Sequence, residues 1–404
     1  GDLPVVISEY GVPSSRGNAH LQPQGWHHGG HSEQAQGEID ARLTRDIVAA
    51  GAAGAGLFAL IDEWFKKNWI VIDFEVPLER NRLWLNALDA EQNYGLIAMR
   101  PGRRDSAITI DGRAGDWRGR APLLSAASAG AGDPLALRAL AVSHDEGYLY
   151  LRLDVGRVDW SRARYLIGID TYDRARGDTR LPYTGATSPV GLEFVIDLRG
   201  PEDSRLLVDE PYNLYRDAAI RGASPPAMQQ IYNRPFQTVA NSDGRYDTLV
   251  VQTNRRRVGR DGTVFPAMGY ERNRLLHARQ PDHSLADWYA DPSGVIELRL
   301  PWGMLHVLDP SSRLVLFGDE RTNEIDGRPT DGIRFVVQSY DPGRPSASGE
   351  RLPRAGVAPA TFTWAGWEEP RWWWERKPAF EAMKRVYRAI PADPRVTAGS
   401  GRPR

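Results

Sequence analysis

The sequence predicts a chain of two unlike parts, an α/β part over residues 1–99 and an all-β part over residues 106–360, followed by a Trp-rich end over residues 361–404. The first part alternates apolar runs with amphipathic segments of helical period. The second part has short alternating strands separated by turn residues, which is typical of an antiparallel sandwich. A length of 404 residues also favours more than one domain.

Strand and helix signals alternate in the first part. Residues 5–7 are a β-branched run, and a polar loop follows it. A helix is predicted over 32–50, because Ser32 can cap its start and its apolar residues share one face. A second apolar run covers 54–61, and a second helix is predicted from Pro77 through Leu88. The order is therefore β-α-β-α.

Both predicted strands end in acidic residues. Glu9 follows the first strand, and Asp62 and Glu63 follow the second. In (β/α) barrels the inner strands are continuously apolar, and the chemistry gathers at their C-terminal ends. Two units cannot close a barrel of eight strands, so the pattern predicts one portion of such a barrel.

The stretches PVVISEYG and GLFALIDEWFKKNW resemble the last two β/α units of the retaining glycoside hydrolases of clan A, particularly the TIM barrels of families 2 and 5. The resemblance covers about residues 3–98. It implies that Glu9 is the catalytic nucleophile, that Tyr10 follows it as the usual aromatic residue, and that Trp64 lines the subsite where the bond is cut. In that clan the acid lies at the fourth strand, which implies an upstream or second-chain barrel portion.

Hydrolysis with retention requires two carboxylates about 5–5.5 Å apart. A strand end would fix the position of Glu9 for nucleophilic attack, although such a residue can also simply pair with a nearby Lys or Arg. Adjacent strands lie about 4.8 Å apart. Asp62 or Glu63 is therefore an alternative acid within this chain.

A histidine-rich loop, HHGGH, lies between the two units. Its neutral imidazoles would suit zinc, but no carboxylate accompanies them at ligand spacing, so we expect no metal here. A loop that faces the substrate is the favoured interpretation. Trp26 and His27 are then candidate sugar contacts.

The pattern changes at RPGRRDS, residues 100–106, and no helix longer than about three turns is predicted from there to residue 360. The predicted strands are Leu137–Val142, Tyr148–Val155, Tyr165–Ile169, Gly191–Leu198, Thr248–Thr253, Gly294–Leu300 and Gly332–Ser339.

The stretches ITIDGRAGDWRG, HDEGYLYLRLDV, YLIGIDTYD, GLEFVIDL and IELRLPWGML follow one another in an order that resembles DOMON-like and family 9 carbohydrate-binding sandwiches. Such sandwiches carry sugars, haem or no ligand. Trp117 and Trp160 are candidate stacking platforms for a sugar, and both also suit a core. Asp170, Asp173 and Asp178 offer oxygen ligands for calcium, but they do not match EF-hand spacing, and we expect no cofactor.

The last segment predicts a helix over Pro378–Ile390 and a frayed tail after Pro391. Trp372, Trp373 and Trp374 cannot all point the same way, so part of this cluster is expected to pack between the two parts, next to Trp364 and Trp367.

Composition limits the partners. The formal net charge is −1, so we expect neither nucleic acid nor a membrane as a partner. The absence of cysteine excludes disulfides and cysteine nucleophiles and is compatible with a secreted protein, for which we expect an extracellular or periplasmic location.

Together these features predict the C-terminal part of a retaining glycoside hydrolase that acts on a poly- or oligosaccharide. The first alternative is a non-catalytic carbohydrate-binding protein in which the β/α part only supports the sandwich. The second is a haem or redox module, which the lack of a clear His–Met ligand pair disfavours.

Overall fold

The computed structural model describes residues 3–126, 130, 132–215, 238–280, 282–318 and 326–390. Strands make up 36% of the structure and helices 15%, so the protein is sheet-rich. Most of its sheets are antiparallel, and no barrel closes among the described residues. The prediction of a sheet-rich chain is confirmed, while the assignment of the first part to a TIM barrel finds no support in the structure.

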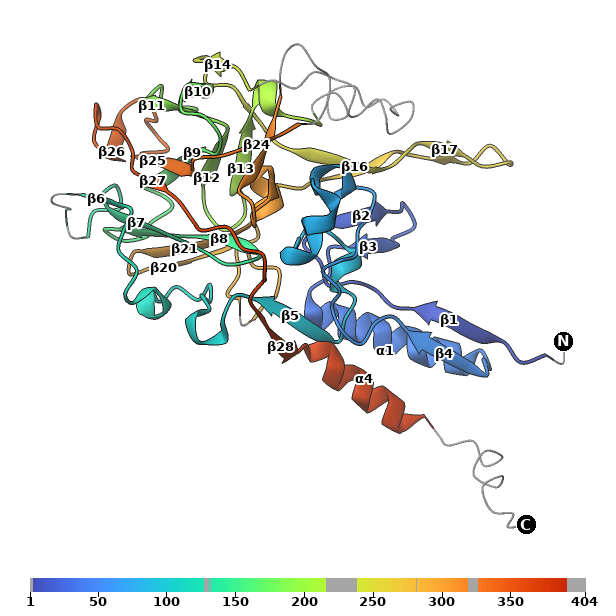
Figure 1. Ribbon diagram of the computed structural model, residues 1–404. Helices are drawn as coiled ribbons and strands as arrows, with labels where there is room; N and C mark the ends of the chain where they lie inside the picture. The colour runs from blue at the N-terminus through green and yellow to red at the C-terminus, as the bar shows by residue number, and fades with distance from the viewer. Residues whose placement is uncertain are drawn as a thin grey trace.

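The α/β part is built on one short parallel sheet (Figure 1). Its strands are β1 (Val6–Tyr10) and β4 (Gly54–Leu57), and α1 (Glu33–Ala49) lies between them in the sequence. The side chain of Ser32 caps α1 by accepting a hydrogen bond from the amide of Ala35 at 3.1 Å. The predicted first helix is thus confirmed. A hairpin of β2 (Asn18–Leu21) and β3 (His27–Gly29) is inserted between β1 and α1.

The first strand is exposed rather than buried. Val5 is 61% exposed and Val6 62%. α1 packs against β1 and β4, but among the described residues no further strand pairs with either strand and so covers these side chains. Parallel sheets are normally covered on both faces. The sequence pattern therefore identified the strand correctly and misjudged its surroundings.

The second predicted helix, from Pro77 through Leu88, is also wrong. In place of the predicted helix the structure has a short 3-10 helix, η2 (Leu78–Leu83), after which the chain continues in turns. The side chain of Asn86 accepts a hydrogen bond from the amide of Leu88 at 3.1 Å. Bonds of this kind compete with the helical ladder and so favour turns.

The all-β part is a sandwich of two antiparallel sheets. The larger has the order β15-β13-β12-β9-β25-β26, with β27 also pairing β25, and the smaller has the order β20-β21-β8-β7-β6. The strands of the larger sheet are β9 (Arg164–Asp170), β12 (Phe194–Leu198), β13 (Arg205–Asp209), β15 (Tyr246–Asp247), β25 (Ile333–Tyr340), β26 (Ser348–Leu352) and β27 (Thr361–Phe362). Those of the smaller sheet are β6 (Leu124–Ser125), β7 (Leu137–His144), β8 (Tyr148–Val155), β20 (Trp288–Asp291) and β21 (Val295–Pro301).

Shorter sheets flank the sandwich. Their strands are β10 (Gly177–Arg180), β11 (Thr187–Leu192), β14 (Ala240–Asn241), β16 (Val250–Asn254), β17 (Arg257–Val258), β18 (Val264–Phe265), β19 (Met268–Glu271), β22 (Val307–Asp309), β23 (Leu314–Phe317) and β24 (Asp326–Pro329). Each of the seven predicted strands overlaps an observed one. The helices between residues 106 and 360 are short 3-10 turns in the part of the chain that the structure describes, as predicted.

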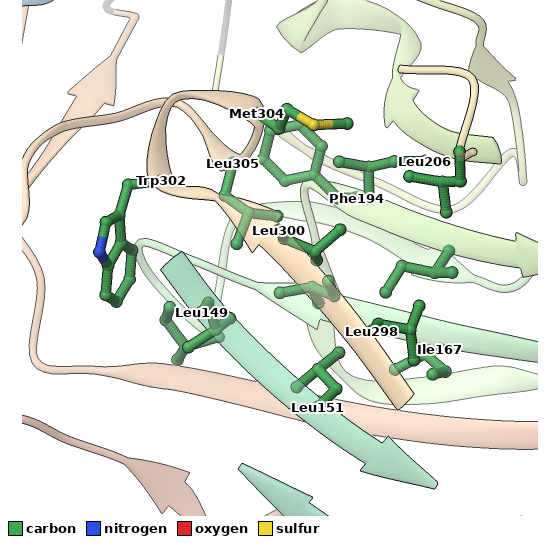
Figure 2. Close-up of a cluster of buried hydrophobic side chains, with 14 of the residues drawn as sticks. Leu149, Leu151, Ile167, Phe194, Leu206, Leu298, Leu300, Trp302, Met304 and Leu305 are labelled. Carbon is green, nitrogen blue, oxygen red and sulfur yellow. The ribbon is translucent and has the colours of Figure 1, made fainter. Parts of the chain in front are cut away.

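The main core lies between the two sheets. Figure 2 shows Leu151 of β8 and Leu298 of β21 packing toward Ile167 of β9, all three fully buried. The same cluster of buried residues includes Trp84 and Leu88 of the first part. The two predicted parts therefore share one hydrophobic core, and burial of these two side chains against the sandwich stabilises their association.

The end of the chain returns to the α/β part. β28 (Trp372–Arg376) pairs antiparallel with β5 (Ile97–Pro101), and α4 (Pro378–Ala389) packs against α1, as Figure 1 shows. The helices approach closely at Gly37, where an added Cβ would lie 2.7 Å from the Cα atom of Ala379. The helix predicted over Pro378–Ile390 is confirmed, and the predicted frayed tail lies outside the described residues.

The tryptophans of β28 lie on both faces of the strand. Trp372 and Trp374 are 39% and 47% exposed and contact each other, and Trp373 lies on the opposite face of β28. Trp364 is buried in the sandwich core, while the indole of Trp367 donates to the carbonyl of Leu83 at 2.7 Å. Trp367 is thus one of the side chains that join the two parts. No described helix combines the length and the apolar character that a membrane crossing would require.

Candidate functional site

Glu9 lies at the C-terminal end of β1 and is exposed. The next side chain, Tyr10, points toward the helices, where its hydroxyl lies 2.7 Å from that of Thr44 and 3.1 Å from that of Tyr387. Neighbouring side chains of a strand point to opposite faces. β1 is irregular between Ile7 and Tyr10, and the exposure of Glu9 places its side chain on the open side of the sheet, whereas Tyr10 is engaged between α1 and α4.

An aromatic wall stands beside the ends of β1 and β4. Phe58 directly follows β4, and its ring contacts that of Tyr94 edge-on, with centroids 5.1 Å apart. The ammonium of Lys66 lies 4.9 Å from the centroid of the Phe58 ring. The amide of Phe58 donates to the carbonyl of Tyr10 at 2.9 Å, which holds the two strand ends together.

Tyr94 connects this wall to the hairpin. Its hydroxyl lies 2.9 Å from Nε2 of His28, and the same nitrogen lies 3.2 Å from a carboxylate oxygen of Glu91. Burial raises the pKa of the Tyr94 hydroxyl, and the negative charges of Glu91, Asp40 and Glu9 raise it further. Tyr94 is therefore a neutral phenol at physiological pH.

The sequence did not single out Phe58 or Tyr94. Phe58 is part of an apolar run that predicts a buried strand, so it carries no separate signal. Tyr94 comes into the site through tertiary packing. The only sequence feature that could indicate Phe58 is the aromatic residue expected at the end of the second strand, and the resemblance places Trp64 there.

The β2–β3 hairpin adds a second group of rings. His20 packs against His28 at 5.8 Å and against Trp69 at 5.5 Å, and the indole of Trp69 lies 3.3 Å from Nε2 of His20. Burial lowers the pKa of His20, so its ring is neutral at pH 7. Trp26, at the hairpin turn, is 58% exposed and stacks on His20 at 6.0 Å.

The loop histidines do not gather around a metal position. His27 contacts His31 edge-on at 6.2 Å, while His28 is turned toward Tyr94. Within the described ranges, no three His, Asp or Glu side chains are arranged to hold a metal ion. His27 and Trp26 instead lie on the partly open hairpin.

The two acidic residues after β4, Asp62 and Glu63, both lie near lysine side chains. Asp62 is buried, and one of its oxygens accepts from the ammonium of Lys377 at 2.7 Å and from the amide of Gly95 at 2.9 Å. Burial raises the pKa of Asp62, and the charge of Lys377 opposes this shift. Glu63 is half-buried, 3.9 Å from Lys66. Trp64 is 2% exposed and is therefore covered by protein, not presented to a ligand.

The sandwich residues singled out from sequence lie mostly in the core. Trp117 is 1% exposed, and its indole donates to a carboxylate oxygen of Glu297 at 2.7 Å. Trp160 is half-buried and packs edge-on against Trp288 at 5.5 Å. In this structure the ring of Trp117 is not available to stack on a ligand.

The three aspartates of DTYDRARGD are held apart by separate interactions. Asp170 forms an ion pair with Arg334 at 3.0 Å, Asp173 accepts from the amide of Ala175, and Asp178 accepts from the amides of Arg180 and Gly244. These are ion-pair and turn contacts. They do not converge on a calcium position.

Asp40 is a buried acid close to the site. It lies on α1, and its Oδ1 accepts from the amide of Val12 at 3.0 Å, whereas Oδ2 has no partner. Burial raises its pKa to about 7. This carboxyl therefore carries a full charge only above neutral pH.

We expect Asp40→Asn to stabilise the protein at alkaline pH. The pKa in the folded state lies above the ordinary value of 3.8, so folded protein binds more protons between about pH 4 and pH 7, and wild-type stability falls as the pH rises through this window. The amide keeps the bond to Val12 without the charge. Urea unfolding should show the variant more stable by ~2–4 kcal/mol at pH 8 and nearly equal near pH 4. A difference that does not change with pH would contradict this account.

Comparison with known proteins returned no relatives. No family model matches the chain, and neither a curated protein nor a solved structure matches it.

Proposed function

We propose that this chain is the C-terminal part of a retaining glycoside hydrolase that acts on a poly- or oligosaccharide, with Glu9 as the nucleophile. One observation carries the proposal: an exposed carboxylate stands at the C-terminal end of a parallel strand, on the open face, beside the rings of Phe58 and Tyr94. Catalytic groups of β/α folds occupy this position. Aromatic faces beside it suit the apolar faces of sugar rings.

The proposed reaction has two steps. An oxygen of Glu9 attacks the anomeric carbon and forms a glycosyl ester, while an acid delivers a proton to the departing glycosidic oxygen. Water then attacks the same carbon, the ester bond breaks, the conjugate base of that acid takes up the proton from the water, and Glu9 is regenerated as a carboxylate. The ring of Tyr94, whose hydroxyl is engaged with His28, offers an aromatic contact to the sugar.

Glu63 stays the alternative acid within this chain, half-buried and 3.9 Å from Lys66, but the resemblance places the acid in other β/α units. Asp62 is committed to Lys377, and Asp40 is enclosed beneath the strand ends. Exposed apolar side chains of β1 and of the turn after β4, among them Val6 and Leu60, offer a surface for further parallel β/α units. We propose that such units, upstream or in a second chain, complete the sheet and supply the acid.

The second candidate function is carbohydrate binding without catalysis. The engagement of Asp62 with Lys377 favours it, because this carboxylate is then not free to act as the partner acid. In this case a protein that contains the completing units would bind saccharides and hydrolyse none of them.

Covalent labelling tests the proposal directly. A 2-deoxy-2-fluoroglycosyl fluoride carries a leaving group that needs little help from an acid, and its C2 fluorine slows the second step, so the ester on Glu9 should accumulate. Intact-mass measurement of a protein that contains these 404 residues and the completing units should show one added fluoroglycosyl group. Peptide mapping should place it on Glu9. Labelling of a different carboxylate, with Glu9 free, would refute the assignment.

A further inference from the structure

A cavity of about 530 Å³ lies at the junction of the two parts. Its walls come from β5 and β28, from the start of α1, from Gln280 and residues 282–284, and from β21 of the sandwich. A smaller space of about 90 Å³ shares Arg100, Arg299 and Trp373 with it and extends toward Arg16. The larger volume falls in the range of small-molecule sites. None of these residues belongs to the group around Glu9.

Three carboxylates at this junction, Glu33, Glu375 and Asp287, have arginine partners. Arg100 binds both oxygens of Glu33, at 2.6 and 2.9 Å, and also contacts Glu375 at 2.7 Å. Arg16 pairs with Asp287 at 3.0 Å. Asp145, which also lines the smaller space, accepts instead from the amides of Gly147 and Tyr148 and from the hydroxyl of Tyr150.

Arg299 is a further cation at this junction. It is 8% exposed, and its Nη2 donates to the carbonyls of Ser284 and Ala286 at 2.7 and 3.0 Å. Its guanidinium lies 4.6 Å from the centroid of the Tyr148 ring. No carboxylate of the described residues forms an ion pair with it, so its direct contacts are neutral oxygens and a ring, and the charge of Glu33 reaches it only through space. Burial of a charge without a counter-ion is costly.

The walls offer further donors. The indole nitrogen of Trp373 is buried and has no partner in the described protein. Gln280 lines both spaces. Its side-chain oxygen accepts from the amide of Ile110, so its NH2 group is the donor that it can offer. An unpaired guanidinium together with an unpaired indole N–H favours an acceptor-rich, negatively charged occupant.

We propose that this cavity binds a small ligand through a carboxylate that pairs with Arg299. A uronic acid and a simple organic acid share this chemistry, and the volume admits either. The site is independent of hydrolysis at Glu9, so it is tested by binding and not by activity.

The test is calorimetric titration of the 404-residue protein with D-glucuronate, D-glucose and acetate. We expect saturable binding of glucuronate and at least ~10-fold weaker binding of glucose, which has the same ring without the carboxylate. Acetate that binds as tightly as glucuronate would identify a simple carboxylate as the recognised group, and weaker acetate would identify the uronic acid. Equal affinities for glucose and glucuronate, or no glucuronate binding, would overturn the proposal.

Two variants locate the binding. Arg299→Gln removes the charge and keeps an amide donor, so glucuronate affinity should fall at least ~10-fold while glucose affinity is unchanged. Ala107→Trp fills the cavity from an exposed position that makes no side-chain bond, and it should abolish glucuronate binding. Ala114→Trp, at an exposed position off the cavity wall, is the matched control. If Arg299→Gln fails to fold, Ala107→Trp decides, and retention of full affinity in that variant would overturn the proposal.

Discussion

Replacing Glu9 by Gln is expected to lower the rate of glycoside hydrolysis at least ~10³-fold, because the amide cannot form the glycosyl ester. The assay is release of an aryl alcohol from aryl glycosides by a protein that contains these residues and the completing β/α units. Glu38→Gln is the matched control, since Glu38 is an exposed glutamate on α1 that bonds only to Gln34. Its rate should equal that of the wild type.

An added nucleophile separates loss of chemistry from loss of fold. In Glu9→Gly, azide can enter the space of the missing side chain, attack the anomeric carbon and displace the leaving group. The expected product is a glycosyl azide of inverted configuration, at a rate that rises with azide concentration. Full hydrolytic activity in Glu9→Gln would refute the nucleophile assignment.

Replacing Lys377 by Met is expected to lower the free energy of unfolding by ~3–5 kcal/mol, because it leaves the buried carboxylate of Asp62 without its counter-ion. Lys377 is 2% exposed, and its ammonium also donates to the hydroxyl of Ser14 at 3.0 Å and to the carbonyl of Asn93 at 3.2 Å. Denaturant unfolding at pH 7 measures the loss. The loss should shrink at lower pH, where Asp62 takes up a proton.

Lys384→Met on α4 is the control for this variant. Lys384 is 41% exposed and lies 3.8 Å from Glu381, so its removal should change stability by no more than ~0.5 kcal/mol. The double variant Lys377→Met, Asp62→Asn should recover part of the loss, because the uncompensated charge is gone. A single Lys377→Met variant as stable as the control would show that the pair contributes little.

The local features of the fold could be predicted from the sequence. Ser32 caps α1 as expected, and the alternation of apolar residues located strands such as β8 and β21 to within about a residue. Capping and periodicity act over a few residues. They do not depend on the partner against which an element packs.

The surroundings of these elements could not be predicted. The apolar residues 5–7 predict a buried strand, yet Val6 is exposed. Burial of a strand depends on the distant segments that pack against it. Trp117 reads as a sugar platform, but its indole is satisfied by Glu297, 180 residues away. The sequence predicts Asp62 as a candidate acid, but in the folded protein it forms an ion pair with the distant Lys377. These are contacts of long sequence separation, which composition and spacing do not encode.

The closure of the α/β part by β28 and α4 also bears on biosynthesis. Lys377 leaves the ribosome 315 residues after Asp62, when most of the sandwich has already been translated. Until then β5 lacks its neighbouring strand, α1 lacks its neighbouring helix, and Asp62 lacks its cation. Residues 33–101 therefore lack these partners until residues 372–389 have been translated, and we expect a nascent-chain chaperone to find a long-lived target there.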